Sequence, residues 1–144
     1  MEEILQHIPA RSMVERLLAA AGVIAMAGGS ATVWAFDPTQ THLFPVCPLL
    51  ALTGFACPGC GLTRGFHALF HGDIVTALDF NGLIPIWTVI FGYLFVSLVL
   101  TATRGRGLPW RFIRPWMLFG LLVVMLTFGV LRNLPYYPFN ILFP

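Results

Sequence analysis

Three long apolar stretches divide the sequence, and polar or proline-rich segments separate them. The stretches cover residues 13–36, 83–103 and 115–131. A helix needs about 20 apolar residues to cross the hydrocarbon core of a bilayer. The first two stretches meet this length directly, and the third meets it when the aromatic residues at its ends lie at the interfaces. The pattern predicts an all-α integral membrane protein in which these three stretches are transmembrane helices.

The segment between the first two spans, residues 37–82, has a different pattern. Residues 43–56 are apolar, but prolines and a glycine interrupt them and the run is too short to cross a bilayer. A re-entrant stretch fits such a segment, because irregular backbone at membrane depth must be buried in protein. We therefore expect this part of the chain to lie at one face of the membrane.

Two short helices are predicted after the re-entrant stretch. Between Pro58 and His71 the apolar side chains recur with the helical period, which is typical of a helix that lies along a membrane surface. Gly72 ends this helix, and Asp73 is placed to cap a second helix over residues 74–80. The first helix carries an apolar face and a polar face, made respectively by Leu62, Phe66, Leu69 and Phe70 and by Arg64, His67 and His71.

Charged residues are few, and their placement orients the chain. Of 144 residues, 58% are hydrophobic and 10% are charged, and all eight basic residues are arginines. The absence of a basic field excludes a nucleic-acid partner. Cytoplasmic loops carry an excess of arginine, and six of the eight arginines lie before the first span or in its first turn, or follow the second span. The N-terminus is therefore predicted to be cytoplasmic.

This orientation divides a single membrane domain, residues 1–144, into its parts. Residues 1–12 form a cytoplasmic lead, 37–82 lie at the outer face, 104–114 form an arginine-rich cytoplasmic loop and 132–144 form an outer tail. Arg64 and Arg132 then lie on the side that disfavours arginine, so each is expected to have an anionic partner. That partner is either an aspartate of the outer face, with Asp73 the first choice, or a lipid phosphate.

Several short motifs together resemble a known family. They are Cys47-Pro48, Cys57-Pro58-Gly59-Cys60-Gly61-Leu62-Thr63-Arg64, His71-Gly72-Asp73, Asn81 and Arg132-Asn133-Leu134-Pro135. Over residues 43–144 the chain is similar to the small bacterial membrane proteins of "domain of unknown function 2752". The resemblance implies a multi-pass protein of the bacterial inner membrane and implies no activity. One departure is Asn81-Gly82-Leu83, where the family has Asn-Pro-Leu.

The matching polar residues form a candidate cluster that binds an anion or stabilises the fold. Its members are Arg64, Thr63, Asp73, Asn81, Arg132 and Asn133. With no catalytic triad, phosphate-binding loop or pair of carboxylates in the sequence, no enzyme class is supported. We expect a non-enzymatic module without a cofactor, which binds membrane lipid, a membrane-protein partner or a second copy through the outer region around Arg64.

The three cysteines support three interpretations. The favoured one is a structural disulfide between Cys47 and either Cys57 or Cys60, because a non-spanning segment outside the cytoplasm needs to be tied down. The second is thiol redox chemistry, since Cys57-x-x-Cys60 has the spacing of exchange motifs. The third is zinc bound by Cys57, Cys60, His67 and His71. A straight helix would carry the histidines about 10–16 Å from Cys60, which argues against this ligand set.

Overall fold

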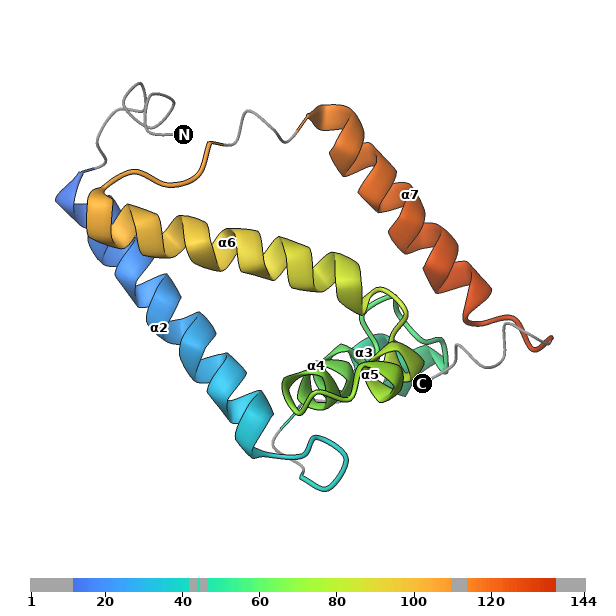
Figure 1. Cartoon of the computed structure of the whole chain (residues 1–144). Coiled ribbons are helices and arrows are strands. Elements are labelled where there is room, and N and C mark those ends of the chain that lie inside the picture. Colours follow the sequence, from blue (N-terminus) through green and yellow to red (C-terminus); the bar gives the residue numbers. More distant parts are fainter. Residues whose placement is uncertain (1–11, 42–43, 45–46, 110–113, 137–144) are drawn as a thin grey trace. The chain divides into compact units, whose positions relative to one another are not determined.

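The computed structural model describes residues 12–41, 44, 47–109 and 114–136, and all regular structure in these residues is helical (Figure 1). The six helices are α2 (Met13–Ala35), α3 (Pro48–Thr53), α4 (Leu62–Phe70), α5 (Ile74–Phe80), α6 (Ile84–Arg104) and α7 (Pro115–Leu131). The predicted all-α class is confirmed. The ends of the three long helices lie within one residue of the predicted apolar stretches.

Two of the long helices, α2 and α6, are long and apolar enough to cross a membrane. In their most apolar windows only 6% and 17% of the residues are buried inside the protein, whereas the core helix of a soluble domain is mostly buried. The third long helix, α7, is also apolar, but with 17 residues it is shorter than the other two. The predicted cytoplasmic lead and outer tail lie, apart from Ser12 and residues 132–136, outside the described residues.

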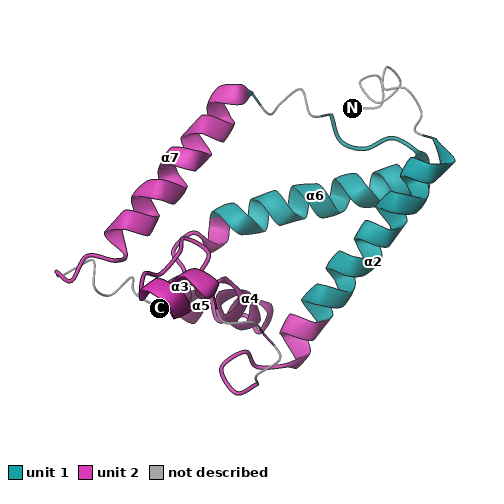
Figure 2. Ribbon diagram, turned by 180° about the vertical axis from the view of Figure 1, so that it is seen from behind, with its two compact units in different colours: residues 1–31, 86–114 teal, residues 32–85, 115–144 magenta. Residues whose placement is uncertain are grey.

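The chain forms two compact units, coloured separately in Figure 2. The first comprises residues 1–31 and 86–114. In this unit the segment after α6 folds back on the helix, and the N–H of Leu108 donates a hydrogen bond to Ser97 Oγ at 3.1 Å. The Arg16 guanidinium caps the end of α6, donating to the carbonyls of Ala102 and Thr103 at 3.2 and 3.0 Å.

The second unit comprises residues 32–85 and 115–144 and contains an antiparallel pair, α4 and α5. A small apolar core lies between these helices and the start of α6, made by Ala68, Ala77 and Ile84. Gly72, with φ of +81°, ends α4 and reverses the chain. Asp73 then caps α5, accepting a hydrogen bond from the N–H of Thr76 at 3.0 Å. The predicted boundaries of α5 are therefore confirmed.

One predicted boundary is wrong. The helix expected from Pro58 begins at Leu62, because residues 57–60 form a turn in which the N–H of Cys60 donates to the Cys57 carbonyl at 3.0 Å. Gly61 follows the turn with φ of +80° and redirects the chain. A side chain there would collide with the carbonyl oxygen of Phe80. The steric need for glycine at position 61 separates the cysteine turn from α4.

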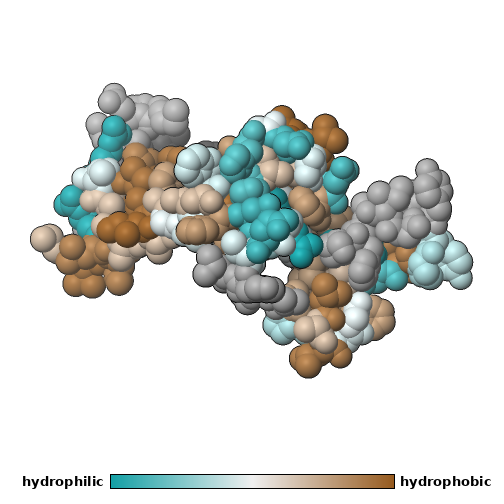
Figure 3. Space-filling model, turned by 90° about the horizontal axis from the view of Figure 1, so that it is seen from below, coloured by the Kyte–Doolittle hydropathy of each residue, from teal (hydrophilic) through white to brown (hydrophobic). Residues whose placement is uncertain are grey.

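Large apolar side chains are exposed over much of the surface, as the brown areas of Figure 3 show. On α7 and α2 these include Trp116, Phe119, Leu126, Leu17 and Ile24, all more than half exposed. The fully buried side chains are instead small or polar, with Arg132 and Asn81 the largest of them. Within the described residues, the best-buried part of the second unit is thus a polar one, around the cysteine turn.

Candidate functional site: a three-cysteine cluster

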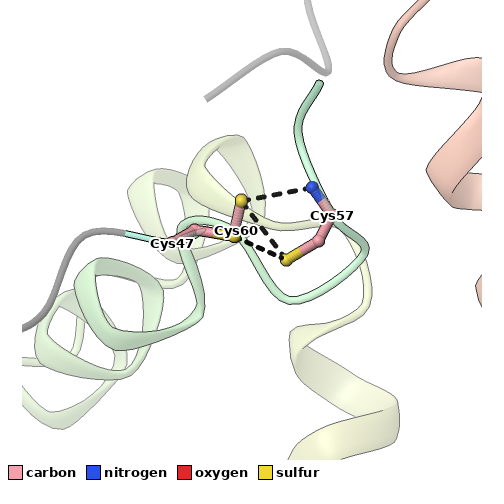
Figure 4. A group of neighbouring side chains, drawn as sticks. All are labelled: Cys47, Cys57 and Cys60. Carbon is pink, nitrogen blue, oxygen red and sulfur yellow. Dashed lines mark hydrogen bonds between the residues drawn. The ribbon is translucent and has the colours of Figure 1, made fainter. Parts of the chain in front are cut away.

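Three thiols converge in the second unit, and each is placed by a local feature of the chain. Cys47 is the N-cap residue of α3, whose first helical residue is Pro48. Cys57 and Cys60 are the first and last residues of the turn that precedes Gly61. Figure 4 shows the three side chains pointing toward one another. The Cys57 sulfur lies 3.3 Å from the Cys47 sulfur and 3.3 Å from the Cys60 sulfur.

No disulfide bond joins any two of the three cysteines. All three sulfur atoms lie within 4.8 Å of each other, and Cys60 is buried whereas Cys47 and Cys57 are partly exposed. The N–H of Cys57 also donates to the Cys60 sulfur at 3.2 Å. The cluster therefore has a closed side at Cys60 and an accessible side at Cys47 and Cys57.

Side chains from distant parts of the sequence hold the backbone of the cysteine turn. Asn81 Nδ2 donates to the carbonyls of Pro58 and Cys60 at 2.9 and 3.0 Å. Its Oδ1 accepts from the N–H of Leu83 at 2.9 Å, so the same side chain connects the turn to the start of α6. Asn81 is 1% exposed, and its amide makes three of the four hydrogen bonds it can form.

Asn133, just beyond α7, binds the residue that precedes the turn. Its Oδ1 accepts from the N–H of Ala56 at 2.8 Å, and its Nδ2 donates to the carbonyl of Ala56 at 2.8 Å. The Asn133 amide thus satisfies both the backbone N–H and the backbone carbonyl of the buried Ala56. Pro58 packs on α7 as well, since a side chain at Gly129 would lie 3.0 Å from Pro58 Cγ.

Arg132 lies fully buried beneath the turn. Its Nη1 donates to the carbonyls of Cys57 and Cys60 at 2.9 and 3.1 Å, and the guanidinium lies 5.0 Å from the centre of the Phe128 ring. Nε and Nη2 are buried without an acceptor among the described residues. Burial lowers the pKa of Arg132, and negative charge on the three thiols, Cys60 foremost, acts in the opposite direction. Negative charge on the cysteines would therefore offset part of the cost of burying this cation.

The thiols differ in acidity because their surroundings differ. The N–H of Leu50 at the start of α3, and then the Cys57 thiol, lower the pKa of Cys47 to about 7. Burial, and then hydrogen bonding with Cys57, raise the pKa of Cys60 to about 12. Cys47 thus carries negative charge near neutral pH far more readily than Cys60 does.

The remaining predicted site residues lie apart from the cluster. Arg64 is exposed on α4, and Thr63 is half-buried beside it. Asp73 is occupied as the cap of α5. The N–H and hydroxyl of Thr39 lower the pKa of the Asp37 carboxyl, and the charges of His67 and Arg64 add to this effect. The predicted polar cluster is consequently divided between the cysteine turn, which receives Asn81, Arg132 and Asn133, and the surface of α4 and α5.

The two histidines, one on α4 and one at its C-terminal end, have partners of their own. His67 Nδ1 hydrogen-bonds the carbonyl of Val33 at 2.7 Å, and His71 Nδ1 hydrogen-bonds the carbonyl of His67 at 2.9 Å. His71 stacks on Trp34 with ring centres 6.0 Å apart. The structure brings Cys47, rather than a histidine, to the pair Cys57 and Cys60.

The comparison with protein families bears on the segment that contains the cluster. Residues 47–95 match the model of the family described as Protein of unknown function (DUF2752). This confirms the resemblance predicted from the motifs. The DUF2752 segment contains all three cysteines and Asn81 but ends before Arg132 and Asn133, so the resemblance over the rest of residues 43–144 stays a prediction. No curated protein and no solved structure matches the chain.

The geometry adds a role that the motifs alone did not suggest. Cys47, Cys57 and Cys60 together offer three soft donors to one ion. The sequence instead suggested a disulfide for Cys47 and a metal-ligand set that combines Cys57 and Cys60 with two histidines. The signal was present in the spacing Cys-x9-Cys-x2-Cys with a proline after each of the first two cysteines. The spacing alone does not reveal the path of residues 48–56, which brings Cys47 next to Cys57 and Cys60.

Proposed function

We propose that the three-cysteine cluster binds a thiophilic divalent metal ion, with zinc as the first candidate, in a protein of the bacterial inner membrane. The observation that carries the proposal is the convergence of three sulfur atoms within 4.8 Å of one another. Cysteine pairs two residues apart are typical zinc ligands, and three protein ligands leave a fourth tetrahedral position open. The accessible side at Cys47 and Cys57 is where that position would lie.

Distances favour a metal over a disulfide in this arrangement. Three thiolates at about 2.3 Å from a tetrahedral zinc ion lie about 3.8 Å from one another. The sulfurs of a disulfide lie about 2.05 Å apart. The separations of 3.3 Å between Cys57 and each neighbour are closer to the metal spacing. Small outward movements of the side chains would admit the ion, whereas a disulfide requires a larger inward movement.

Thiol–disulfide exchange is the second candidate, because the Cys57 sulfur is equally close to both other sulfurs. In such an exchange the Cys47 thiolate would attack Cys57 of a Cys57–Cys60 disulfide, form the Cys47–Cys57 bond and release Cys60 as a thiolate. A thiol with a high pKa is a poor leaving group, and the pKa of Cys60 is raised to about 12. A bound cation has the opposite effect, since it deprotonates its thiol ligands outright.

The membrane setting belongs to the same proposal. The apolar helices α2, α6 and α7 are proposed as three spans, with the N-terminus in the cytoplasm and the cysteine turn at the outer face. The support is the placement of six arginines, which lie before α2 or in its first turn, or at and beyond the last residue of α6. The exposed apolar side chains of α2 and α7 agree with lipid contact.

Arg64 supports a separate and weaker proposal, contact with an anionic lipid headgroup or a membrane-protein partner. It is exposed on α4, and exposed apolar residues of the neighbouring α5, Ile74 and Val75, would enter the headgroup region beside it. Arginine beside an apolar helical face is typical of interfacial binding. This contact is independent of the cysteines and would survive their replacement.

Metal binding is tested on the full chain, purified in detergent under reducing conditions without chelator. We expect about one zinc ion per chain, measured by elemental analysis after desalting. Replacing a ligand removes a metal bond, so C47S, C57S and C60S should each lower zinc affinity by more than the 10- to 100-fold that loss of an outer-shell partner costs. The control variants H67A and H71A, which remove the two histidines of the ligand set considered from the sequence, should retain wild-type affinity.

Two results would contradict the proposal. One is a wild-type chain that binds no zinc while mass spectrometry shows a disulfide between two of the cysteines, which would favour the structural or exchange interpretations. The other is zinc that is lost in H67A or H71A and retained in C47S, which would return the site to the ligand set Cys57, Cys60, His67 and His71.

A further inference from the structure

Among the residues that the structure describes, no acidic side chain hydrogen-bonds the buried Arg132 guanidinium beside the three thiols. The Arg132 side chain has no exposed surface, and its Nη1 is engaged by two neutral carbonyls, those of Cys57 and Cys60. Two further nitrogens, Nε and Nη2, find no acceptor among the described residues. A buried charge that lacks a counter-charge is strongly destabilising. The question is which negative charge this arginine complements.

Counting charges around a bound ion gives an answer. Three thiolates around a divalent ion leave one negative charge, and one buried guanidinium cancels it. Around a monovalent ion the same thiolates would leave two negative charges, and one would remain uncompensated. Such an excess charge is costly at the closed side of the cluster, where Cys60 is buried, because the interaction of charges is weakly screened there. The fixed charge of one arginine therefore matches a divalent ion with three thiolates.

The position of Arg132 makes its charge compensation specific to the cysteine cluster. The guanidinium is fully buried and binds the backbone carbonyls of Cys57 and Cys60, two of the three proposed ligands. Arginine keeps its charge in proteins, and the Phe128 ring covers its face at 5.0 Å. No other basic side chain donates to the cysteine turn in the part of the chain that the structure describes.

We propose that Arg132 is the counter-charge of the metal complex, and that its positive charge allows all three cysteines to bind a divalent ion as thiolates. The inference rests on the metal function proposed above. It makes Arg132 a positioning residue that acts through the ligands and does not itself bind the metal. It also predicts that charge at position 132 matters more than the pattern of hydrogen bonds.

The test compares the full chain with R132K, which keeps the charge, and R132Q, which keeps a hydrogen-bond donor but removes the charge. Zinc affinity is measured by competition with a chromophoric chelator. The number of thiols that still react with a disulfide dye is counted after zinc loading. We expect no reactive thiol in the wild-type and R132K proteins. In R132Q we expect one reactive thiol and an affinity lower by about 10- to 100-fold.

Each outcome decides the inference. Equal losses in R132K and R132Q would show that the hydrogen bonds to the carbonyls, and not the charge, are what matters, and would overturn it. Wild-type zinc affinity in R132Q would overturn it as well, while leaving the metal function intact. A wild-type chain that binds no zinc would overturn both proposals together.

A second measurement covers the case in which R132Q does not fold. Cadmium bound to the wild-type chain gives a thiolate-to-metal charge-transfer absorption whose intensity increases with the number of thiolates. The same measurement on C47S provides the two-thiolate reference. A wild-type intensity equal to that of C47S would show two thiolates and overturn the inference. A wild-type intensity about one and a half times that of C47S, the ratio of three thiolates to two, would support it.

Discussion

At the scale of the residue, the cysteine turn depends on polar side chains that bind backbone groups rather than ligands. Asn81, Arg132 and Asn133 together bind the carbonyls of Ala56, Cys57, Pro58 and Cys60. Buried backbone groups that lose such a partner destabilise the fold by about 1–3 kcal/mol each. The sequence identified these three side chains as members of a polar cluster. Their partners, however, lie up to 77 positions away, beyond the reach of any local pattern.

A substitution at Asn133 tests this arrangement. N133A leaves the N–H and the carbonyl of Ala56 without their partner, and Ala56 is only 2% exposed. We expect a loss of about 2–4 kcal/mol in the free energy of unfolding, because two buried groups are affected. The loss is measured by denaturant titration of the zinc-free protein in detergent. T127A, at an exposed position of α7, is the control and should change stability by less than about 0.5 kcal/mol. Similar values for the two variants would show that Asn133 does not hold the turn.

At the scale of the element, two glycines with nearly the same backbone conformation have different surroundings. Gly61 has φ of +80° and Gly72 has φ of +81°, so each favours glycine for the same conformational reason. A side chain at Gly72 would meet nothing within 4 Å, whereas one at Gly61 would collide with the carbonyl of Phe80. The helix boundary predicted at Pro58 was wrong because this contact, and not the local propensity of the residues, ends the turn.

The two glycines form a matched pair of substitutions. G72A should lower the free energy of unfolding by about 1–2 kcal/mol, the cost of a left-handed conformation for a residue with a side chain. G61A carries the same cost and in addition about 1–3 kcal/mol for the collision. The difference is measured by denaturant titration, and zinc affinity should fall in G61A alone, since only that position adjoins the cysteine turn. Equal stabilities would mean that the chain relaxes around position 61.

At the scale of the whole molecule, the orientation in the membrane remains to be measured. It is inferred from the arginines around the start of α2 and the end of α6, while residue 40 lies on the opposite side of the first span. In a chain whose three cysteines are serine, Q40C should react with a membrane-impermeant thiol reagent in intact cells. S12C should react only after the cells are opened. Both positions are exposed in the folded chain, so burial does not complicate the comparison. Labelling of S12C in intact cells would reverse the proposed topology.

The sequence by itself determined α5 and the three long helices, because helix formation depends on residues three or four positions apart and on local caps. It placed α5 behind Asp73 and all three long helices to within one residue at each end. Only the tertiary structure decided which side chains meet. The convergence of Cys47 with Cys57 and Cys60 depends on the fold of the ten intervening residues. The burial of Arg132 against the cysteine turn depends on a contact across 75 positions, and no local pattern in the sequence encodes a contact at that separation.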